Sequence, residues 1–243
     1  MTHIITWLAL ASLSWATQLS PNDYYPPTST ADTFKLIANV TDLSQDLNPS
    51  IHHFLLTGVH AGAGSEIAVL TNDTGHVLWE NGTDDAIGVA SNSGGIVPYS
   101  VVLDPAAPND PDSSYVNYMA INVGETQPGI GIRADDLSYA ELYSPDSGTF
   151  IVCYEPNPVY DRPQYPVKFA KAAMVGGVAY QQIPDQCVAI KLLAQCGDEP
   201  LETPPPGANY DTKFARKVRC YADVDAIDWS QSNWSQSNWS QSN

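Results

Sequence analysis

Two short segments place an aspartate in a pattern that can do chemistry. They are Asp73-Thr74-Gly75 and Asp146-Ser147-Gly148-Thr149. Two such loops, brought together, let two carboxylates share a proton and activate water, as in an aspartic protease. In those enzymes a buried apolar strand leads directly into each aspartate, whereas here Asn72 and Pro145 precede them, and the aspartates are only 73 positions apart. We therefore expect two ordinary hairpin turns, and a secreted hydrolase using Asp73 and Asp146 is kept as an alternative function.

The other polar residues match no catalytic or metal-binding motif. The segment Gly62–Glu66 (Gly-Ala-Gly-Ser-Glu) departs from the Gly-x-Ser-x-Gly elbow of a serine hydrolase, and its glycines indicate a tight turn. On one strand, His52 and His60 would share a face but lie about 26 Å apart, too far to bind one metal ion. The sequence predicts no catalytic residues, no metal site and no cofactor, and it leaves open whether the protein is an enzyme.

Aromatic residues offer one more kind of chemistry. The chain has 13 Tyr and 6 Trp, which could form a platform on which sugar rings stack. Aromatic side chains in strands more often serve as core residues or cross-strand pairs. A glycan-binding, lectin-like module or a host-directed effector is therefore an alternative function, with cell-wall or host glycans as partners.

The charge of the chain excludes several classes of partner. It carries 27 Asp+Glu against 10 Lys+Arg, which gives a net charge of −17 and a pI near 4.3. Without a basic surface, the protein cannot displace counterions from phosphates, so we exclude nucleic acid as a partner. The same balance disfavours binding to anionic membranes.

The N-terminal residues predict export. Residues 1–16 resemble a secretory signal peptide, because the apolar stretch from Ile4 to Leu13 is shorter than the roughly 20 residues that span a bilayer. Ser14 and Ala16 are the small residues expected at a cleavage site. No second long apolar run follows. We predict a secreted protein, extracellular or associated with the cell wall, that does not span the membrane.

The chain also carries signals for N-linked glycans. Sequons begin at Asn39, Asn72 and Asn81 in the body of the chain and at Asn233 and Asn238 near its end, which predicts a glycoprotein. The last two lie in a tail, 227–243, that contains three copies of Trp-Ser-Gln-Ser-Asn. We expect this tail to be disordered, because it offers little to bury.

Four cysteines suggest two disulfides in an oxidising compartment. Cys153, Cys187, Cys196 and Cys220 allow three connectivities. The residues between Cys187 and Cys196 form one continuous apolar strand, whose ends would lie about 30 Å apart. A disulfide needs Cα atoms about 5.5 Å apart, so these two cysteines should not pair with each other. Our prediction is Cys153–Cys187 and Cys196–Cys220.

The body of the chain indicates an all-β fold. After a polar, proline-rich lead-in at 17–32, residues 33–226 form a single domain of about 10–13 short strands, as a barrel, a trefoil or a sandwich. Lys168–Val175 could form two helical turns or a strand. The clearest strands, rich in Val, Ile, Thr, Tyr and Phe, are Thr33–Val40, Ile51–Val59, Glu66–Thr71, His76–Glu80, Ile96–Leu103, Tyr115–Val123, Leu137–Tyr143, Thr149–Tyr154, Val178–Ile183 and Lys217–Ala222.

Three segments resemble a known family. The segments Thr33–Leu36, His60–Thr71 and Cys187–Leu193 are similar to a family of secreted filamentous-fungal proteins with a single domain, sometimes labelled cell-wall or IgE-binding-like. The resemblance covers roughly residues 33–222 and implies a fungal extracellular protein with no assigned chemistry. We predict a secreted acidic glycoprotein of the fungal cell surface or medium that acts by structure or binding, without catalysis.

Overall fold

The fold is all-β, as predicted. The computed structural model describes residues 25–82, 86–91, 95–106, 108, 110–135, 138–157, 162–176 and 178–229. Within these residues the chain forms strands and one short 3₁₀ turn at Leu43–Gln45. The segment that could have been helical, Lys168–Val175, lies in a strand. No helix in this part of the chain is long and apolar enough to cross a membrane.

The strands outnumber the 10–13 that we expected, because many are only two to four residues long. In chain order they are β1 (Ser29–Ala31), β2 (Phe34–Val40), β3 (Leu55–Gly62), β4 (Ser65–Thr71), β5 (Leu78–Asn81), β6 (Gly88–Ser91), β7 (Tyr99–Pro105), β8 (Val116–Val123), β9 (Gly131–Ile132), β10 (Leu142–Tyr143), β11 (Gly148–Cys153), β12 (Glu155–Asn157), β13 (Arg162–Gln164), β14 (Val167–Val175), β15 (Val178–Gln181), β16 (Cys187–Cys196), β17 (Ala215–Arg216) and β18 (Val218–Cys220).

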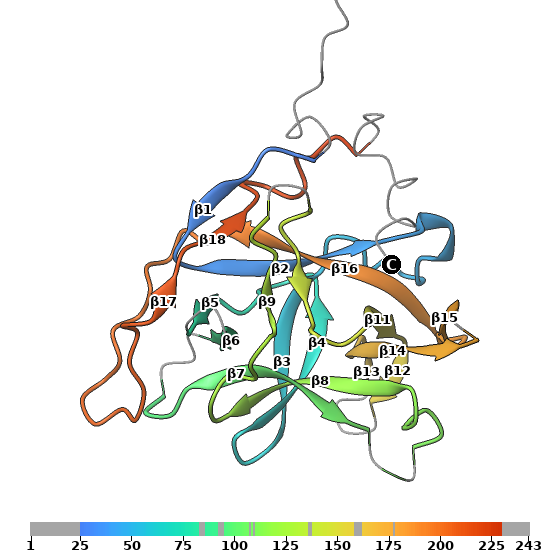
Figure 1. Cartoon of the computed structure of the whole chain (residues 1–243), viewed down its shortest axis with the longest axis horizontal. Helices are drawn as coiled ribbons and strands as arrows, with labels where there is room; N and C mark the ends of the chain where they lie inside the picture. The colour runs from blue at the N-terminus through green and yellow to red at the C-terminus, as the bar shows by residue number, and fades with distance from the viewer. Residues whose placement is uncertain are drawn as a thin grey trace, which may run out of the picture.

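The main sheet closes on itself, as in a barrel. Its hydrogen-bonded neighbours follow one another as β16, β2, β5, β6, β7, β8, β14, β11 and back to β16. The β3–β4 hairpin bridges this ring, since β3 pairs with β2 and β4 pairs with β8. In Figure 1 the hairpin runs between β2 and β16 on one side and β7 and β8 on the other. Of the three predicted architectures, this closure favours the barrel.

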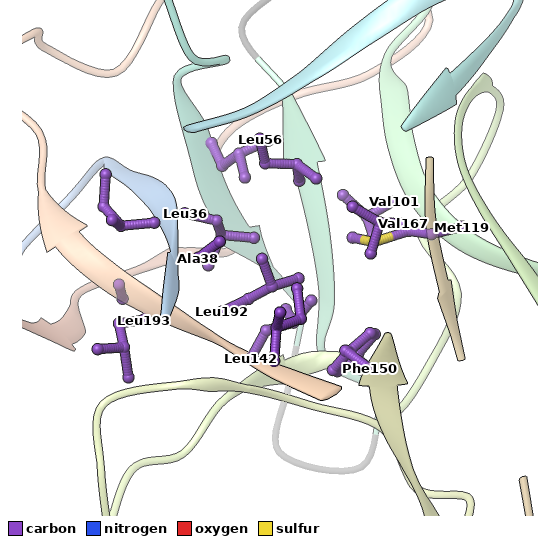
Figure 2. Close-up of a cluster of buried hydrophobic side chains, with 14 of the residues drawn as sticks. Leu36, Ala38, Leu56, Val101, Met119, Leu142, Phe150, Val167, Leu192 and Leu193 are labelled. Carbon is purple, nitrogen blue, oxygen red and sulfur yellow. The ribbon is translucent and has the colours of Figure 1, made fainter. Parts of the chain in front are cut away.

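The hydrophobic core fills the interior of the ring. Side chains alternate between the two faces of a strand, so every second residue points inward. Paired inward residues such as Leu56 with Leu70 and Leu103 with Met119 are buried. Figure 2 shows the core gathered from many strands, through Leu36, Ala38, Leu56, Val101, Met119, Leu142, Phe150, Val167, Leu192 and Leu193.

Strands β2 and β16 are buried on both faces. Leu192 and Leu193 are consecutive, point to opposite faces, and are both fully buried. Beyond β11 the edge of β16 is also hydrogen-bonded, because Ala194 donates its N–H to the carbonyl of Ala140 and accepts from the N–H of Tyr221. Leu193 belongs to the same buried cluster as Tyr139, Tyr221 and Val224. The pairing of β2 with β16 therefore lies inside the protein rather than on its surface.

Two disulfides hold the two ends of β16, and the predicted pairing is confirmed. Cys153 of β11 is bonded to Cys187, the first residue of β16. Cys220 of β18 is bonded to Cys196, the last residue of β16. The pairing follows from β16 being one uninterrupted strand, which keeps its two cysteines apart and leaves each to bond with a neighbouring strand.

One other prediction is wrong. The loops around Asp73 and Asp146 are not hairpin turns, because β4 does not pair with β5 and β10 does not pair with β11. Residues on either side of 33–226 also make contacts with the barrel. At one end β1 pairs with β18, and at the other Trp229 packs against the core. The segments around β1 and Trp229 are too polar or too short to fold alone, and tertiary contacts hold both of them on the barrel.

Removing either disulfide should cost similar stability. Each bridge restricts the unfolded chain by closing a loop, with sequence separations of 34 and 24 residues. We expect C153A/C187A and C196A/C220A each to lower the free energy of unfolding by about 3–4 kcal/mol. Urea denaturation followed by tryptophan fluorescence measures this change. A loss below about 1 kcal/mol in both variants would show that the bridges do not constrain the unfolded state.

Candidate functional site

Three aromatic rings from separate segments contact one another in a row. Tyr154 follows β11, Tyr165 precedes β14 and Phe54 precedes β3. The ring centroids of Tyr154 and Tyr165 are 6.0 Å apart, and those of Tyr165 and Phe54 are 5.9 Å apart. Tyr154 is 42% exposed, while the other two rings are partly buried against the core. We call Tyr154, Tyr165 and Phe54 the aromatic row.

The barrel positions the row through backbone contacts. Leu70 in β4 donates its N–H to the carbonyl of Tyr165 at 2.9 Å, and Phe54 accepts from the N–H of Ala38 in β2 at 2.8 Å. Burial, and then the neighbouring Tyr154, raise the pKa of the Tyr165 hydroxyl. The Tyr165 hydroxyl is therefore neutral at physiological pH, and the Tyr165 and Phe54 rings are anchored on the core.

A buried lysine lies close to this row in the chain. The Nζ of Lys168 in β14 forms a 2.5 Å ion pair with Glu155, which directly follows Tyr154, and its side chain is 4% exposed. The same Nζ donates to the hydroxyl of Tyr118 at 3.0 Å, and Tyr118 donates to Asp110 at 2.6 Å. Burial alone would lower the pKa of Lys168, but the bonds to Glu155 and Tyr118 outweigh it and raise the pKa. This network joins Glu155, which follows Tyr154 in the chain, to β14 and β8.

A second polar cluster joins three strands elsewhere in the barrel. The Nδ1 of His76 lies 2.8 Å from the hydroxyl of Ser91 in β6, and its Nε2 lies 3.6 Å from a carboxylate oxygen of Glu66 in β4. The carboxylate lies over Gly58 in β3, where a Cβ would come within 1.9 Å of it. Only glycine at position 58 leaves space for Glu66 in this position.

The cluster has the residue types of a serine hydrolase but not the geometry. Ser91 is 5% exposed, so its hydroxyl is not open to a substrate. The contact between Glu66 and His76, at 3.6 Å, is longer than a hydrogen bond that would orient the imidazole. Sequence analysis identified neither Ser91 nor Glu66, because only the pairing of distant strands brings them to His76.

The predicted aspartic pair does not exist in this fold. Val69 in β4 lies opposite Pro166, and Gly148 in β11 lies opposite Lys171. Pro166 and Lys171 are five residue steps apart in the chain, about 16 Å along an extended strand. Asp73 and Asp146 lie beyond them in opposite directions, and both are exposed. They cannot share a proton, so the alternative of a hydrolase with Asp73 and Asp146 is wrong.

The predicted glycosylation residues lie in three different environments. Asn72 is exposed, Asn81 is partly buried, and Asn39 is only 2% exposed. The side chain of Asn39 is enclosed in β2, so an attached glycan would have no room in the folded barrel. Asn233 and Asn238 lie outside the described residues.

Histidines do not gather around a metal position. The rings of His52 and His53 stack at 3.9 Å, and His60 is exposed on β3. Within the described ranges, no three His, Cys, Asp or Glu side chains come together to hold a metal ion.

Removing the counter-ion of Lys168 should cost more than removing a surface ion pair. We expect Glu155→Gln to lower the free energy of unfolding by about 3 kcal/mol, because it leaves a buried ammonium without its carboxylate. The control is Glu199→Gln, which removes a 3.3 Å ion pair between Glu199 and Lys35. This pair lies on the surface, because the Glu199 side chain is 51% exposed and that of Lys35 is 25% exposed. That change should cost less than about 1 kcal/mol. Equal losses, measured by urea denaturation, would contradict a structural role for Lys168.

The Glu66–His76–Ser91 cluster should make stability fall in acid. Burial lowers the pKa of His76 below 6.5, although Glu66 opposes this shift. The unfolded chain then binds a proton more readily than the folded chain, so the free energy of unfolding decreases as the pH falls below about 6.5. In denaturation curves between pH 5 and 7, His76→Gln should show a weaker pH dependence. The control His60→Gln changes an exposed histidine on β3 and should show the same pH dependence as the unaltered protein. If His76→Gln also shows that pH dependence, His76 does not cause the loss of stability in acid.

Comparison with known proteins assigns the chain to a family. A family model described as a domain of unknown function, DUF7907, matches residues 31–196. The chain is also 31% identical over 222 residues to the antigenic protein SchS34 of Stachybotrys chartarum, an alignment that covers 88% of this chain and 96% of that protein. No solved structure matches. These matches support the resemblance to a fungal family, and the chain belongs to the DUF7907 family.

Proposed function

We propose that this protein is a secreted acidic glycoprotein that works at the fungal cell surface or in the surrounding medium by binding glycans, without catalysis. Its two disulfides fit an oxidising compartment, and its relative is a fungal protein named for its antigenicity. The leader-like residues 1–16 support export.

The observation that carries the proposal is the aromatic row. Tyr154 is 42% exposed and packs on Tyr165, which in turn contacts Phe54 at the edge of the core. The row therefore presents an open aromatic ring that is supported from behind by two further rings. Sugar rings carry apolar C–H faces that pack on aromatic rings.

Charge narrows the class of glycan. With a net charge of −17, the protein repels anionic polymers and attracts cationic ones. Neutral wall polysaccharides such as β-glucan and chitin, and the cationic deacetylated form of chitin, are therefore the candidates. Attraction to a cationic polymer weakens with salt, whereas stacking on the aromatic row does not, so salt separates the two contributions.

Sedimentation with insoluble polysaccharides tests the proposal. The protein should bind at least one of β-glucan, chitin and deacetylated chitin, and Tyr154→Ala should weaken that binding up to about ten-fold. The matched control is Tyr180→Ala, because Tyr180 is 58% exposed on β15, outside the row. Tyr180→Ala should bind like the unaltered protein at both low and high salt.

Two results would refute the proposed function. One is no binding to any of the three polymers above the background of inert beads. The other is an equal loss in the two tyrosine variants, which would show that the row is not the contact surface. Circular dichroism of each variant establishes that the barrel is intact.

A further inference from the structure

We infer that Asn72 is the N-glycosylation site of the barrel, and that Asn39 and Asn81 remain unmodified in the folded protein. The inference rests on the proposed function, because N-linked glycans are added only to chains that enter the secretory route. The sequence presents the three sequons as equivalent, and the fold distinguishes them.

Asn72 lies in an open position. The whole sequon, Asn72, Asp73 and Thr74, is exposed in the loop between β4 and β5. The loop is held locally, with Asp73 donating its N–H to the hydroxyl of Thr71 at 3.2 Å. Since neither β4 nor β5 uses these residues in a ladder, a large sugar chain at Asn72 leaves the strand pairing intact.

Asn39 lies in the most enclosed strand of the barrel. It belongs to β2, pairs with Lys191 of β16, and is followed by the fully buried Val40. Its side-chain oxygen is itself buried. A glycan attached here before folding would prevent β2 from pairing with β16. Chains modified at Asn39 should therefore fail to fold and should be missing from the secreted protein.

Asn81 lies where three strands meet. As the last residue of β5 it pairs with Gly88 of β6 on one side and Ala215 of β17 on the other, and its side-chain oxygen is buried. The next residue, Gly82, has a φ of 123°, and a Cβ there would lie 2.1 Å from the carbonyl of Ala86. Gly82 also donates its N–H to the carbonyl of Phe214 at 3.1 Å. The backbone beside Asn81 is thus too closely packed to accept a sugar.

Peptide mapping of the secreted full-length protein tests the inference directly. An N-glycosidase in heavy-oxygen water converts each glycosylated asparagine to a mass-labelled aspartate. We expect the label at Asn72 and its absence at Asn39 and Asn81. Label at Asn39 or Asn81, or none at Asn72 in a protein glycosylated elsewhere, would overturn the inference.

Variants that remove a sequon give an independent readout. Thr74→Ala, which leaves the asparagine in place, should remove one glycan from the intact mass of the secreted protein, and Asn72→Gln should do the same. The control Thr41→Val removes the sequon of Asn39 and should leave the glycan mass unchanged. A loss of glycan in Thr41→Val would contradict the enclosure of Asn39.

The two proposals fail in different ways. A chain that keeps Met1 and stays inside the cell would refute both secretion and glycosylation. A secreted chain whose label appears at Asn39 or Asn81 refutes only the choice among sequons. Binding to polysaccharides is measured separately and does not depend on which asparagine is modified.

Discussion

The pairing of β2 with β16 is the constraint on which the barrel depends. The ladder runs from Phe34 opposite Cys196 to Val40 opposite Ile190, and both strands are buried on both faces. Along its other edge β2 pairs with both β5 and β3, and the other edge of β16 pairs with β11. The ring described above closes through this pair. A one-residue shift of register would turn Lys35 and Asn39, which lie on the face opposite to Leu36 and Ala38, toward the interior of the ring, so the ladder fixes which residues line that interior.

The same pairing explains what sequence reasoning could and could not predict. The strand between Cys187 and Cys196 was predictable because a long apolar run of β-branched and aliphatic residues has few alternatives, and the disulfides followed from it. The burial of Asn39 was not, because a strand enclosed on both faces shows no alternation of polar and apolar residues. Asn39 therefore looked like an ordinary surface sequon.

The functional clusters were missed for a different reason. Tyr154, Tyr165 and Phe54 come from three separate loops, and Glu66, His76 and Ser91 from three strand neighbourhoods. Tyr154 and Tyr165 flank the β12–β13 hairpin next to the paired residues Glu155 and Gln164, whereas Phe54 reaches them only through the fold. No local spacing links Glu66, His76 and Ser91, because the order of strands in the ring differs from their order in the chain.

The scarcity of basic residues shapes the surface. Of the 10 Lys and Arg, Lys168 is almost fully enclosed beside Glu155, and Lys191 lies 2.8 Å from Glu141 with its side chain 15% exposed. These cations neutralise carboxylates at the edge of the core rather than on the outside. The solvent-facing surface is consequently more uniformly negative than the composition suggests, which favours solubility through mutual repulsion between copies.

Both ends of the described chain meet at one aromatic contact. The ring of Tyr139 lies 4.9 Å from that of Tyr25 and 6.1 Å from that of Trp229. Trp229 is the first residue of the first Trp-Ser-Gln-Ser-Asn copy, and its ring packs against the core. The segments that continue from the two ends of the described chain therefore leave the barrel from the same pole of the molecule.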